Sequence, residues 1–584
     1  MPSATKNGVR KSIKPSTDWL GLDTETIDGY ARLIGLSDGR FFYPKNSADI
    51  LLFLSGFLKA KPTYFFAWNA DYDIQALLKY FPKKIVNKFL MGVEFSMESK
   101  KGAFVVQYIK GKYFRFGDNY IFDAYQYYHS KLKDAAEKYL GERKGDVDAS
   151  TIDETNINTD RVLKYCINDA LLALKLFTRF YGALPDTLKG TKPISCAFYS
   201  YSYFRRELSA NRPKSEVNLY FRNAYHGGRF EIFQRGHFKK LYVYDINSAY
   251  PHEIAKLRNL GRAHYCGFNG YMADATYSIY KLKVDIKNTF VSPLLMKNKL
   301  LCYYPAGKME VFCTKGEYEA VKHYDHEILE AYHVFAGRDY PFRDKVAALY
   351  EKKQRSGFTL PFKIILNSLY GKTAQAVPKY VDLRDLDEDS PVVDYVDSDG
   401  VTYVKFEDIG RSNFIYASEI TARTRLRLYE VVRDHSDDVL MVSTDSVISC
   451  RPLDLPLSDA LGDWKLEMWD EAYLIGSGLY FYKKGGVWAG KFRGYNFGHD
   501  NAQEILDNIL SSKTAQVGFE VKKRYSLQEA RRLGSDDLGN IIKNVTRTMN
   551  LNFDKKRLWL DAWRSGNELN TKKIKSLAIY HTLL

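Results

Sequence analysis

Cysteine is scarce in this 584-residue chain, and its six cysteines form no CxxC pair. A structural zinc site is therefore not expected, and a few scattered cysteines fit a reducing compartment. The sequence also lacks an apolar run of the ~18 residues that a transmembrane helix needs, a secretory signal, internal repeats and low-complexity segments. These absences exclude membrane-spanning, secreted disulfide-rich and repeat proteins. They leave a globular protein of about three to five folding units.

Basic side chains outnumber acidic ones, with 86 Lys and Arg against 70 Asp and Glu and a net charge of +16. A basic protein of enzyme size indicates a polyanionic partner, and nucleic acid is the first candidate. The 45 Tyr and 35 Phe residues could add stacking surfaces for unpaired bases, although most of them belong in the core. Charge alone leaves open a solvated basic surface with no specific partner.

Periodic patterns divide the chain into segments of different structure. Residues 19–23 (WLGLD) predict a buried strand, and strand and helix patterns then alternate to about residue 190, which is typical of an α/β domain. Glycine and proline between residues 184 and 193 end this domain. Residues 241–246 (LYVYDI) predict another apolar strand, and residues 439–450 predict two strands around a tight polar turn.

Two further patterns lie between these strands. Residues 350–370 follow a helical pattern with a break between Gly357 and Pro361. Asp399-Gly400 separates two strand-like runs, so a β-hairpin is predicted there. At the other end of the chain, the first 17 residues are basic and polar and predict a flexible tail.

Acidic residues gather at three places in the predicted α/β domain. Asp23 and Glu25 follow the first strand, and as residues i and i+2 they share one face, where two carboxylates can hold a hard divalent cation. Asp73 closes the stretch NADYD after an apolar run. Tyr165 and Asp169, at i and i+4, lie on one face of a predicted helix. Each of these alone is more often an ordinary strand or helix end.

A second set of polar residues lies later in the chain. Asp245 ends the second predicted strand and Asp445 lies in the polar turn, so both carboxylates can reach the same point at a sheet edge. Lys363, Asn367 and Tyr370 lie at i, i+4 and i+7, on one helix face. The lysine can hold a triphosphate as a point charge, and the tyrosine can lie against a new base pair. Taken singly, Asp245 could be an ordinary acid at a strand end, and the sequence NSLYG could be an ordinary helix C-cap.

The first set resembles the proofreading exonucleases of the DnaQ type, whose motifs DxE, NxxxD and YxxxD occur in the same order. The resemblance implies an RNase H-like α/β domain and a two-metal phosphodiesterase that removes nucleotides from a 3′ end. It implies that the metal ligands are Asp23, Glu25, Asp73 and Asp169, and that Tyr165 orients the attacking water.

The second set resembles motifs A, B and C of family B DNA polymerases, here YDINSAYP, KIILNSLYG and STDS. The resemblance implies an α+β right-hand polymerase domain with palm, fingers and thumb. It implies that Asp245 and Asp445 hold two Mg²⁺ or Mn²⁺ ions, so that both domains carry two-metal sites. The implied nucleotide-binding residues are Ser248, Tyr250, Lys363, Asn367 and Tyr370, with the ring of Tyr250 under the sugar to exclude a 2′-hydroxyl.

One position departs from this pattern, since Ser443 stands where the family usually has the first Asp of motif C. The electrostatics and metal preference of the site are thereby left open. A nuclease whose polymerase half has decayed is one alternative, and a non-catalytic nucleic-acid scaffold is another. The complete set of acids argues against the scaffold, because decay usually removes ligands.

The whole chain resembles the compact protein-primed polymerases of bacteriophages and linear plasmids. Its exonuclease motifs begin at Asp23, close to the first residue, whereas cellular family B enzymes usually carry a large domain before these motifs. The sequence YHGG matches the YxGG motif of that subfamily, and KGDVD contains a lysine where its exonuclease lysine stands. The DNA-binding residues that the resemblance implies are Asn69, Lys144, Tyr225, Gly227, Gly228 and Tyr480.

Two smaller motifs match only loosely. Residues 130–132 partly fit the primer-terminus motif of the subfamily. In its KxY motif Tyr480 fits, but Gly478 replaces the lysine. The residues that could substitute for this lysine are Lys483, Lys484 and Lys491.

The predicted division is a flexible tail (1–17), an exonuclease domain (18–190), a palm (191–259 and 411–484), an insertion (260–345), fingers (346–377), a hairpin insertion (378–410), and a thumb with the C-terminal region (485–584). In the subfamily, the two insertions bind the priming protein and unwind the downstream duplex, respectively. Lysines of the first insertion that could hold an acidic protein primer are Lys281, Lys283, Lys287, Lys297 and Lys299.

The resemblance also implies the partners. They are template and primer DNA, deoxynucleoside triphosphates and a terminal protein that provides the priming hydroxyl, with no membrane association. A monomer in the cytoplasm of a host cell is expected, and a mitochondrial enzyme is the alternative.

Overall fold

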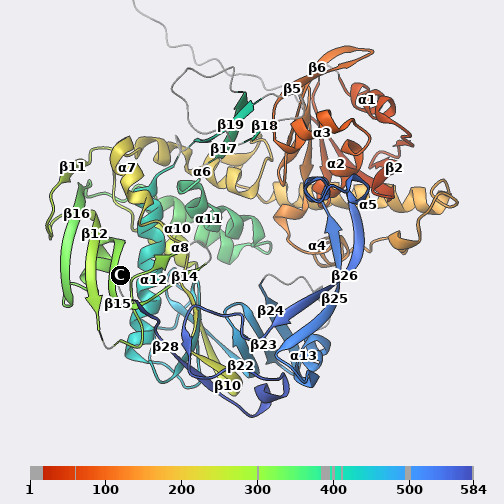
Figure 1. Ribbon diagram of the computed structural model, residues 1–584. Coiled ribbons are helices and arrows are strands. Elements are labelled where there is room, and N and C mark those ends of the chain that lie inside the picture. Colours follow the sequence, from red (N-terminus) through yellow and green to blue (C-terminus); the bar gives the residue numbers. More distant parts are fainter. Residues whose placement is uncertain are drawn as a thin grey trace, which may run out of the picture. The chain divides into compact units, whose positions relative to one another are not determined.

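The structure is a computed structural model that describes residues 17–58, 61–287, 289–298, 301–375, 377–382, 395–396, 402–408, 412–493 and 502–581. The chain forms two compact units (Figure 1). The first comprises Met1–Tyr199, Pro378–Glu407 and Arg524–Lys543, and the second comprises Ser200–Val377, Asp408–Lys523 and Asn544–Leu584. Segments that are remote in sequence therefore share one unit.

The first unit is built on an eight-stranded mixed sheet with the order β3-β2-β1-β4-β8-β7-β6-β5. β1 pairs in parallel with β4 and β4 with β8, and the outer pairs are antiparallel. The strands are β1 (Asp18–Ile27), β2 (Tyr30–Leu36), β3 (Phe41–Phe42), β4 (Thr63–Ala67), β5 (Phe95–Ser99), β6 (Gly102–Ile109), β7 (Tyr113–Phe116) and β8 (Asn119–Asp123). The predicted strand at 19–23 and the mixture of strands and helices are confirmed.

The helices of this unit are α1 (Ser47–Ser55), α2 (Ala70–Leu78), α3 (Lys83–Leu90), α4 (Leu132–Leu140), α5 (Asp160–Gly182) and α14 (Leu527–Arg532). The long helix α5 contacts β1, β2 and β4 (Figure 1), and the ring of its Phe177 stacks on that of Phe66 in β4. It ends at Gly182, just before the predicted chain breakers.

The predicted hairpin around Asp399-Gly400 is present as the antiparallel pair β18 (Tyr395–Val396) and β19 (Thr402–Asp408), with β17 (Val377–Asp382) on the other side of β19. Asp399 and Gly400 themselves lie outside the described residues, as does the predicted tail apart from Thr17.

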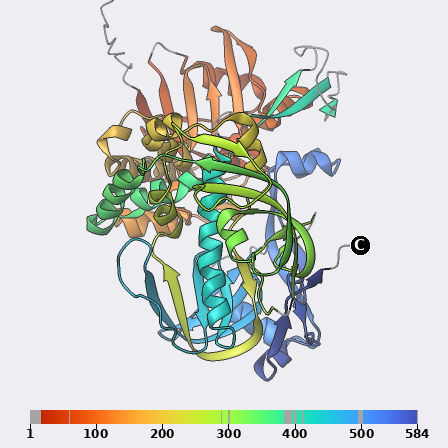
Figure 2. The ribbon, with the colours of Figure 1, turned by 90° about the vertical axis from the view of Figure 1, so that its left-hand side faces the viewer.

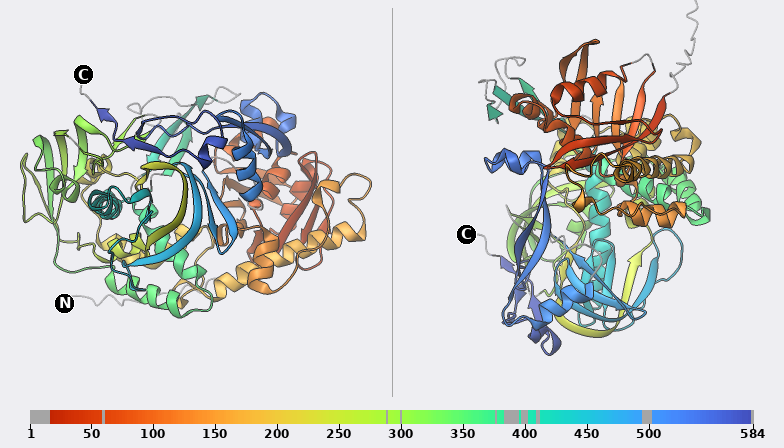
Figure 3. Two further views of the ribbon diagram at one scale, coloured as in Figure 1. Left: turned by 90° about the horizontal axis from the view of Figure 1, so that it is seen from below. Right: turned by 90° about the vertical axis from the view of Figure 1, so that its right-hand side faces the viewer.

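The main sheet of the second unit has β10 (Gln234–Ile246) at its centre and the order β24-β23-β22-β10-β21-β20-β9 (Figure 3). The other strands are β9 (Phe230–Ile232), β20 (Val439–Ser443), β21 (Ser446–Ser449), β22 (Trp464–Gly476), β23 (Leu479–Lys484) and β24 (Val487–Phe492), with β27 (Leu558–Trp559) and β28 (Ile574–Leu577) beside β10. The predicted strand at 241–246 and the two strands around the polar turn are confirmed.

Helix α12 (Phe414–Asp434) lies behind this sheet and runs along the second unit in Figure 2. Its Leu428 and Val432 share one apolar cluster with Tyr244 of β10 and Val442 of β20. The back of the sheet is therefore closed by the core, so only its other face and its strand ends can serve a site.

A second sheet of this unit, β11-β16-β12-β15-β29, is formed largely by the residues predicted as the first insertion. Its strands are β11 (His264–Gly267), β12 (Tyr277–Ile286), β15 (Ala306–Thr314), β16 (Asp325–Phe335) and β29 (Tyr580–His581). Two further pairs are β13 (Met296–Lys297) with β14 (Cys302–Tyr303), and β25 (Gln516–Tyr525) with β26 (Ile541–Asn550).

The remaining helices are α6 (Cys196–Ala210), α7 (Ser215–Arg222), α8 (Ala249–Ala255), α9 (Lys315–Glu319), α10 (Arg343–Arg355), α11 (Leu360–Thr373) and α13 (Ala502–Ser511). The predicted helix with a break near Gly357 and Pro361 is confirmed as α10 and α11. Across the described part of the chain, no helix is both long and apolar enough to span a bilayer.

Candidate active sites

Gly21 of β1 allows helix α5 to pack unusually close to the sheet of the first unit. A Cβ at this position would lie 1.8 Å from the carbonyl oxygen of Ala170, so a side chain cannot be accommodated without a backbone shift. Asp169 immediately precedes Ala170, and Asp23 lies two residues after Gly21 on the same face of β1. The close approach therefore brings the acid of α5 to the acids of β1.

Asp73 joins this cluster from the first turn of α2. It accepts hydrogen bonds from the backbone N–H of Thr24 at 3.0 Å and from its hydroxyl at 2.7 Å. On the α5 side, the Nζ atom of Lys144 lies 2.7 Å from Oδ2 of Asp169. The structure thus brings together the acids of all three motifs. Thr24 is a partner that sequence analysis missed, although its position between Asp23 and Glu25 could have indicated it.

Burial and mutual repulsion raise the pKa values of these acids. Burial, followed by repulsion from Asp169, raises the pKa of Glu25 to about 8, and burial raises the pKa of Asp73 to about 7. The pKa of Asp23 also rises well above its usual range, through burial and then the charge of Glu25. These acids cannot all ionise together without a compensating positive charge.

The donor atoms of this cluster fit a cation. Oδ1 of Asp169 is buried without a hydrogen-bond partner among the described residues. Within the same described part of the chain, Asp23, Glu25 and Cys166 offer ligand atoms that all lie within 4.8 Å of one another. Cys166 was not predicted, and burial raises the pKa of its thiol, which keeps it protonated. Hard carboxylate oxygens are the ligands that Mg²⁺ and Mn²⁺ prefer.

Tyr165 and Asn69 flank the acids. Nζ of Lys144 lies 5.0 Å from the ring centroid of Tyr165, and burial raises the pKa of this phenol to about 12. Asn69 precedes α2 in the left-handed region, with φ of 62°. Its backbone N–H donates to Oδ1 of Asp123 at 2.9 Å, and its side chain makes no capping hydrogen bond. Asp123 is thus a further residue that the motifs did not predict.

A second acid cluster lies at the end of β10 in the second unit. In the antiparallel pairing of β10 with β21, Asp245 lies opposite Ser446, the residue that follows Asp445 in the sequence. The turn that carries Asp445 has Thr444 at φ of 60°, and the N–H of Thr444 donates to the carbonyl of Arg229 at 2.6 Å. Burial and then repulsion from Asp245 raise the pKa of Asp445 to about 7, and burial raises that of Asp245.

Three lysines oppose this rise at Asp245, namely Lys363 of α11, Lys465 of β22 and Lys353 of α10. Lys465 lies directly opposite Asp245 in the pairing of β10 with β22. Lys353 donates a hydrogen bond from Nζ to the hydroxyl of Ser248 at 3.0 Å. Sequence analysis predicted Lys363 alone, because the other two reach the site through strand register and helix packing.

Side chains of motifs A and B meet beside these acids. The rings of Tyr250 and Tyr370 have centroids 4.2 Å apart. Lys363 and Asn367 are exposed on one face of α11. A Cβ at Gly228 would lie 2.8 Å from the hydroxyl oxygen of Tyr250, so the YxGG turn borders the same place.

The rest of the YxGG turn is held from behind. The carbonyl of Gly227 accepts a hydrogen bond from Nη1 of the buried Arg425 at 3.0 Å. The ring of Tyr225 packs beside Phe414, with centroids 6.1 Å apart. Arg425 is a contributor to the site that sequence analysis missed.

The three lysines that could serve the KxY motif differ in their position relative to Tyr480. Tyr480 is only 7% exposed on β23. Lys483 and Lys484 form ion pairs with glutamates of β22, whereas Lys491 of β24 lies directly opposite Tyr480. Lys491 is therefore the neighbour of Tyr480 among the three lysines considered.

The positive charge of the first insertion is partly neutralised. Lys281 lies 3.2 Å from Glu310 and 3.5 Å from Glu330, and Lys287 lies 3.1 Å from Asp285. Lys299 lies outside the described residues. The surface of this insertion is thus of mixed charge, in contrast to the basic surface that counting lysines predicts.

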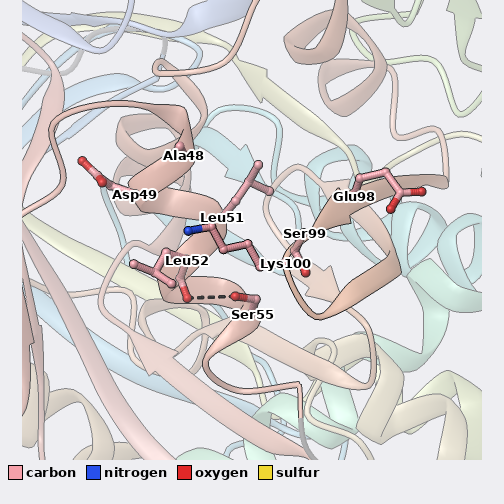
Figure 4. Close-up of a pocket in the computed structure, with 8 residues that line it drawn as sticks. All are labelled: Ala48, Asp49, Leu51, Leu52, Ser55, Glu98, Ser99 and Lys100. Carbon is pink, nitrogen blue, oxygen red and sulfur yellow. Dashed lines mark hydrogen bonds between the residues drawn. The ribbon is translucent and has the colours of Figure 1, made fainter.

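A cavity of about 380 Å³ lies between α1 and the turn that joins β5 to β6 (Figure 4). It is lined by Ala48, Asp49, Leu51, Leu52, Ser55, Glu98, Ser99 and Lys100. None of the predicted site residues belongs to this lining, so this cavity is not assigned to either acid cluster.

Comparison with solved structures shows that the chain has the fold of phi29 DNA polymerase. The chain superposes on phi29 DNA polymerase in complex with primer-template DNA and incoming nucleotides, with a TM-score of 0.65 and 16% identity. The match covers 92% of this chain and 100% of that one, and the orthorhombic crystal form of phi29 DNA polymerase gives the same TM-score. The fold class predicted from the motifs is confirmed.

More particularly, the chain belongs to the family of type B DNA polymerases of the organellar and viral kind, whose sequence profile matches residues 85–415. A DNA polymerase of Acidianus bottle-shaped virus (isolate Italy/Pozzuoli) is 25% identical over 67% of this chain and 59% of the relative. The DNA-directed DNA polymerase of Enterobacteria phage PRD1 is 26% identical over 57% of this chain and 62% of the relative. The chain thus spans about three fifths of the length of the curated relatives it matches.

Proposed function

We propose that this protein is a DNA-directed DNA polymerase that proofreads with its own 3′→5′ exonuclease. The observation that carries the proposal is the presence of two separate acid clusters in one chain. One cluster contains Asp245 and Asp445, and the other is built around Asp23, Glu25 and Asp73. Membership of the type B family and the names of both viral relatives support the same reading.

In the polymerase site, Asp245 and Asp445 would hold two divalent ions, Mg²⁺ or Mn²⁺. Bound there, such ions supply Lewis-acid stabilisation of charge on the attacking and leaving oxygens. The three lysines around Asp245 would bind the triphosphate of the incoming deoxynucleotide as point charges. Tyr370 would lie against the new base pair, and the ring of Tyr250 would fill the space that a 2′-hydroxyl needs.

In the exonuclease site, the acids of β1, α2 and α5 would hold a second pair of ions. Tyr165 would orient the attacking water, and Lys144 would fix both Tyr165 and Asp169. Asn69, whose backbone is held by Asp123, would bind the single-stranded 3′ end. Thr24 would fix the direction of Asp73 through two hydrogen bonds.

A labelled primer annealed to a longer template tests both activities. We expect extension when deoxynucleotides and Mg²⁺ are present, and stepwise shortening from the 3′ end when deoxynucleotides are omitted. EDTA should stop both reactions. Shortening without extension would instead support the alternative of a nuclease with a decayed polymerase half. The absence of both reactions would support the alternative of a non-catalytic nucleic-acid scaffold.

A second candidate function is protein-primed replication of a linear viral or plasmid genome inside the host cell by a monomeric enzyme. The observation that favours it is the five-stranded sheet of the first insertion between motifs A and B. Its mixed charge indicates a protein partner held by paired charges as well as by lysines. Incubation with labelled deoxynucleotide, Mg²⁺ and the terminal protein of the same replicon should give a covalent protein–nucleotide adduct. If no adduct forms while ordinary primers are extended, protein priming is wrong.

We also propose that the hairpin insertion at 378–410 supports strand displacement. Its position between motifs B and C and the pairing of β18 with β19 motivate this role. Deletion of the hairpin should slow synthesis through a downstream duplex and spare synthesis on an open template. Equal slowing on both templates would exclude the role.

A further inference from the structure

A short segment near the C-terminus belongs to the first unit, which we now call the exonuclease unit because it holds the proposed exonuclease site. Residues Arg524–Lys543 connect β25 to β26, in the region that sequence analysis assigns to the thumb, yet they cluster with the first unit. Figure 1 shows this segment beside α2. We call residues 524–543 the C-terminal tip.

The C-terminal tip is built into the core of the exonuclease unit. Leu527 is 5% exposed and belongs to the same apolar cluster as Ile74 and Leu77 of α2. The backbone N–H of Leu527 donates to Oε1 of Gln75 at 2.9 Å. Arg531 donates to the carbonyl of Lys83 at 2.8 Å. Buried contacts of this kind specify one position for the tip on α2 and α3.

Two polar residues of the tip form hydrogen bonds with the first turn of α2. Arg524 donates from Nη2 to the carbonyl of Asp71 at 2.9 Å, and its guanidinium carbon lies 4.8 Å from the ring centroid of Tyr72. Asn540, which is 1% exposed, donates to the carbonyl of Tyr72 at 3.3 Å and accepts from Nε of Arg524 at 2.9 Å. The residues of α2 that accept these bonds lie directly before Asp73.

The tip and Thr24 hold different atoms of this helix turn. Thr24 fixes the carboxylate of Asp73 from β1, whereas Arg524 and Asn540 fix the helix turn that carries it. Residues that orient a metal ligand typically change metal affinity or activity by about 10–100-fold when they are removed.

We propose that Arg524 and Asn540 of the C-terminal tip are positioning residues of the exonuclease site, which hold the first turn of α2 so that Asp73 faces the other acids. This inference rests on the proposed exonuclease function and deepens it. A part of the chain remote in sequence thereby completes the nuclease site, and no exonuclease motif contains it.

The test compares Arg524→Met, Arg524→Lys and Arg531→Met in the full-length protein. Arg531 is the matched control, since it anchors the same tip to α3 and lies away from Asp73. The first readout is the rate of 3′ excision from single-stranded DNA as a function of Mg²⁺ concentration. The second is Mn²⁺ binding without DNA, measured by calorimetry in an Asp445→Asn background that weakens the polymerase site. Primer extension and thermal unfolding report whether the rest of the protein is intact.

We expect Arg524→Met to lower excision by about 10–100-fold and to require more Mg²⁺ for half-maximal rate, with weaker Mn²⁺ binding. Arg524→Lys should restore part of both, and Arg531→Met should stay within about twofold, because Arg531 bonds to α3 and not to the first turn of α2. Equal losses in Arg524→Met and Arg531→Met would show that the tip only docks, and unchanged Mn²⁺ binding and excision in Arg524→Met would also overturn the proposal. If the unaltered protein excises nothing, the proposed nuclease fails, while Mn²⁺ binding still decides the role of Arg524.

Discussion

At the scale of single residues, the two acid clusters differ in how their charge is balanced. Three lysines oppose the rise in pKa at Asp245, whereas Lys144 is the cation that ion-pairs with Asp169 in the exonuclease cluster. Burial is nevertheless the main cause of the raised pKa values in both clusters, about 8 for Glu25, about 7 for Asp73 and about 7 for Asp445. A bound divalent ion should therefore relieve repulsion between carboxylates in both clusters.

Glu25→Gln should stabilise the metal-free protein at pH 8. The pKa of Glu25 is raised above its unfolded value, so the folded state binds more protons and loses stability as pH rises from about 4.5 to about 8. Removing this charge should raise the melting temperature in EDTA by at least about 2 °C, the shift expected for about 1 kcal/mol in a unit of this size. The gain should vanish at pH 4.5, and an equal gain at both pH values would contradict the explanation.

Tyr250→Val should weaken discrimination between deoxyribonucleotides and ribonucleotides. The ring of Tyr250 is held between Tyr370 and the YxGG turn, so its loss opens the space proposed for the sugar. We expect the ratio of ribonucleotide to deoxyribonucleotide incorporation to rise on the order of tenfold, which corresponds to about 1.4 kcal/mol of steric contact. Single-nucleotide incorporation kinetics measure this ratio, and Tyr370→Val is the control for lost stacking. An unchanged ratio would show that Tyr250 is not the residue that excludes the 2′-hydroxyl.

At the scale of elements, the sequence predicted those strands and helices whose periodicity agrees with their burial. β1, β10, the β20–β21 turn and the broken helix α10–α11 were all predicted, because their apolar patterns and breakers are local. The packing of α5 on β1 could not be predicted. It depends on Gly21 lying under Ala170, which is a contact between residues far apart in the chain.

Gly21→Ala should damage the exonuclease unit. Its new methyl group would lie 1.8 Å from the carbonyl oxygen of Ala170, so α5 must move and carry Asp169 away from Asp23. Overpacking of this kind costs about 1–3 kcal/mol. We expect a lower melting temperature and slower 3′ excision, with primer extension retained. Gly182→Ala on α5 is the matched control, since its methyl group meets no atom within 4 Å. Normal excision by Gly21→Ala would refute the packing argument.

At the scale of the whole molecule, the motifs predicted the residues of both acid clusters, and the structure brings each set together. Residues outside any motif could not be predicted. Lys353 and Lys465 reach Asp245 through helix packing and strand register, and Arg524 and Asn540 reach α2 from the C-terminal region. Sequence patterns identify ligands, whereas the groups that orient ligands are set by tertiary contacts.

The net charge of +16 should make DNA binding strongly dependent on salt. With about 6–10 phosphate contacts, affinity is expected to fall roughly 10³–10⁵-fold between 50 and 200 mM salt. Fluorescence anisotropy with a labelled primer-template measures the slope in EDTA, where catalysis is stopped. A flat salt profile would show that the positive charge is not used for phosphate contacts.

The central claim is that one chain holds two independent active sites, and a pair of variants tests it most directly. Asp445→Ala should lower primer extension by about a thousandfold or more, because losing several kcal/mol of transition-state stabilisation has that effect, and should leave 3′ excision intact. Asp23→Ala combined with Glu25→Ala should abolish excision and leave extension intact. Both rates are measured on one labelled primer-template with and without deoxynucleotides. Loss of both activities in both variants, or of neither, would contradict the account.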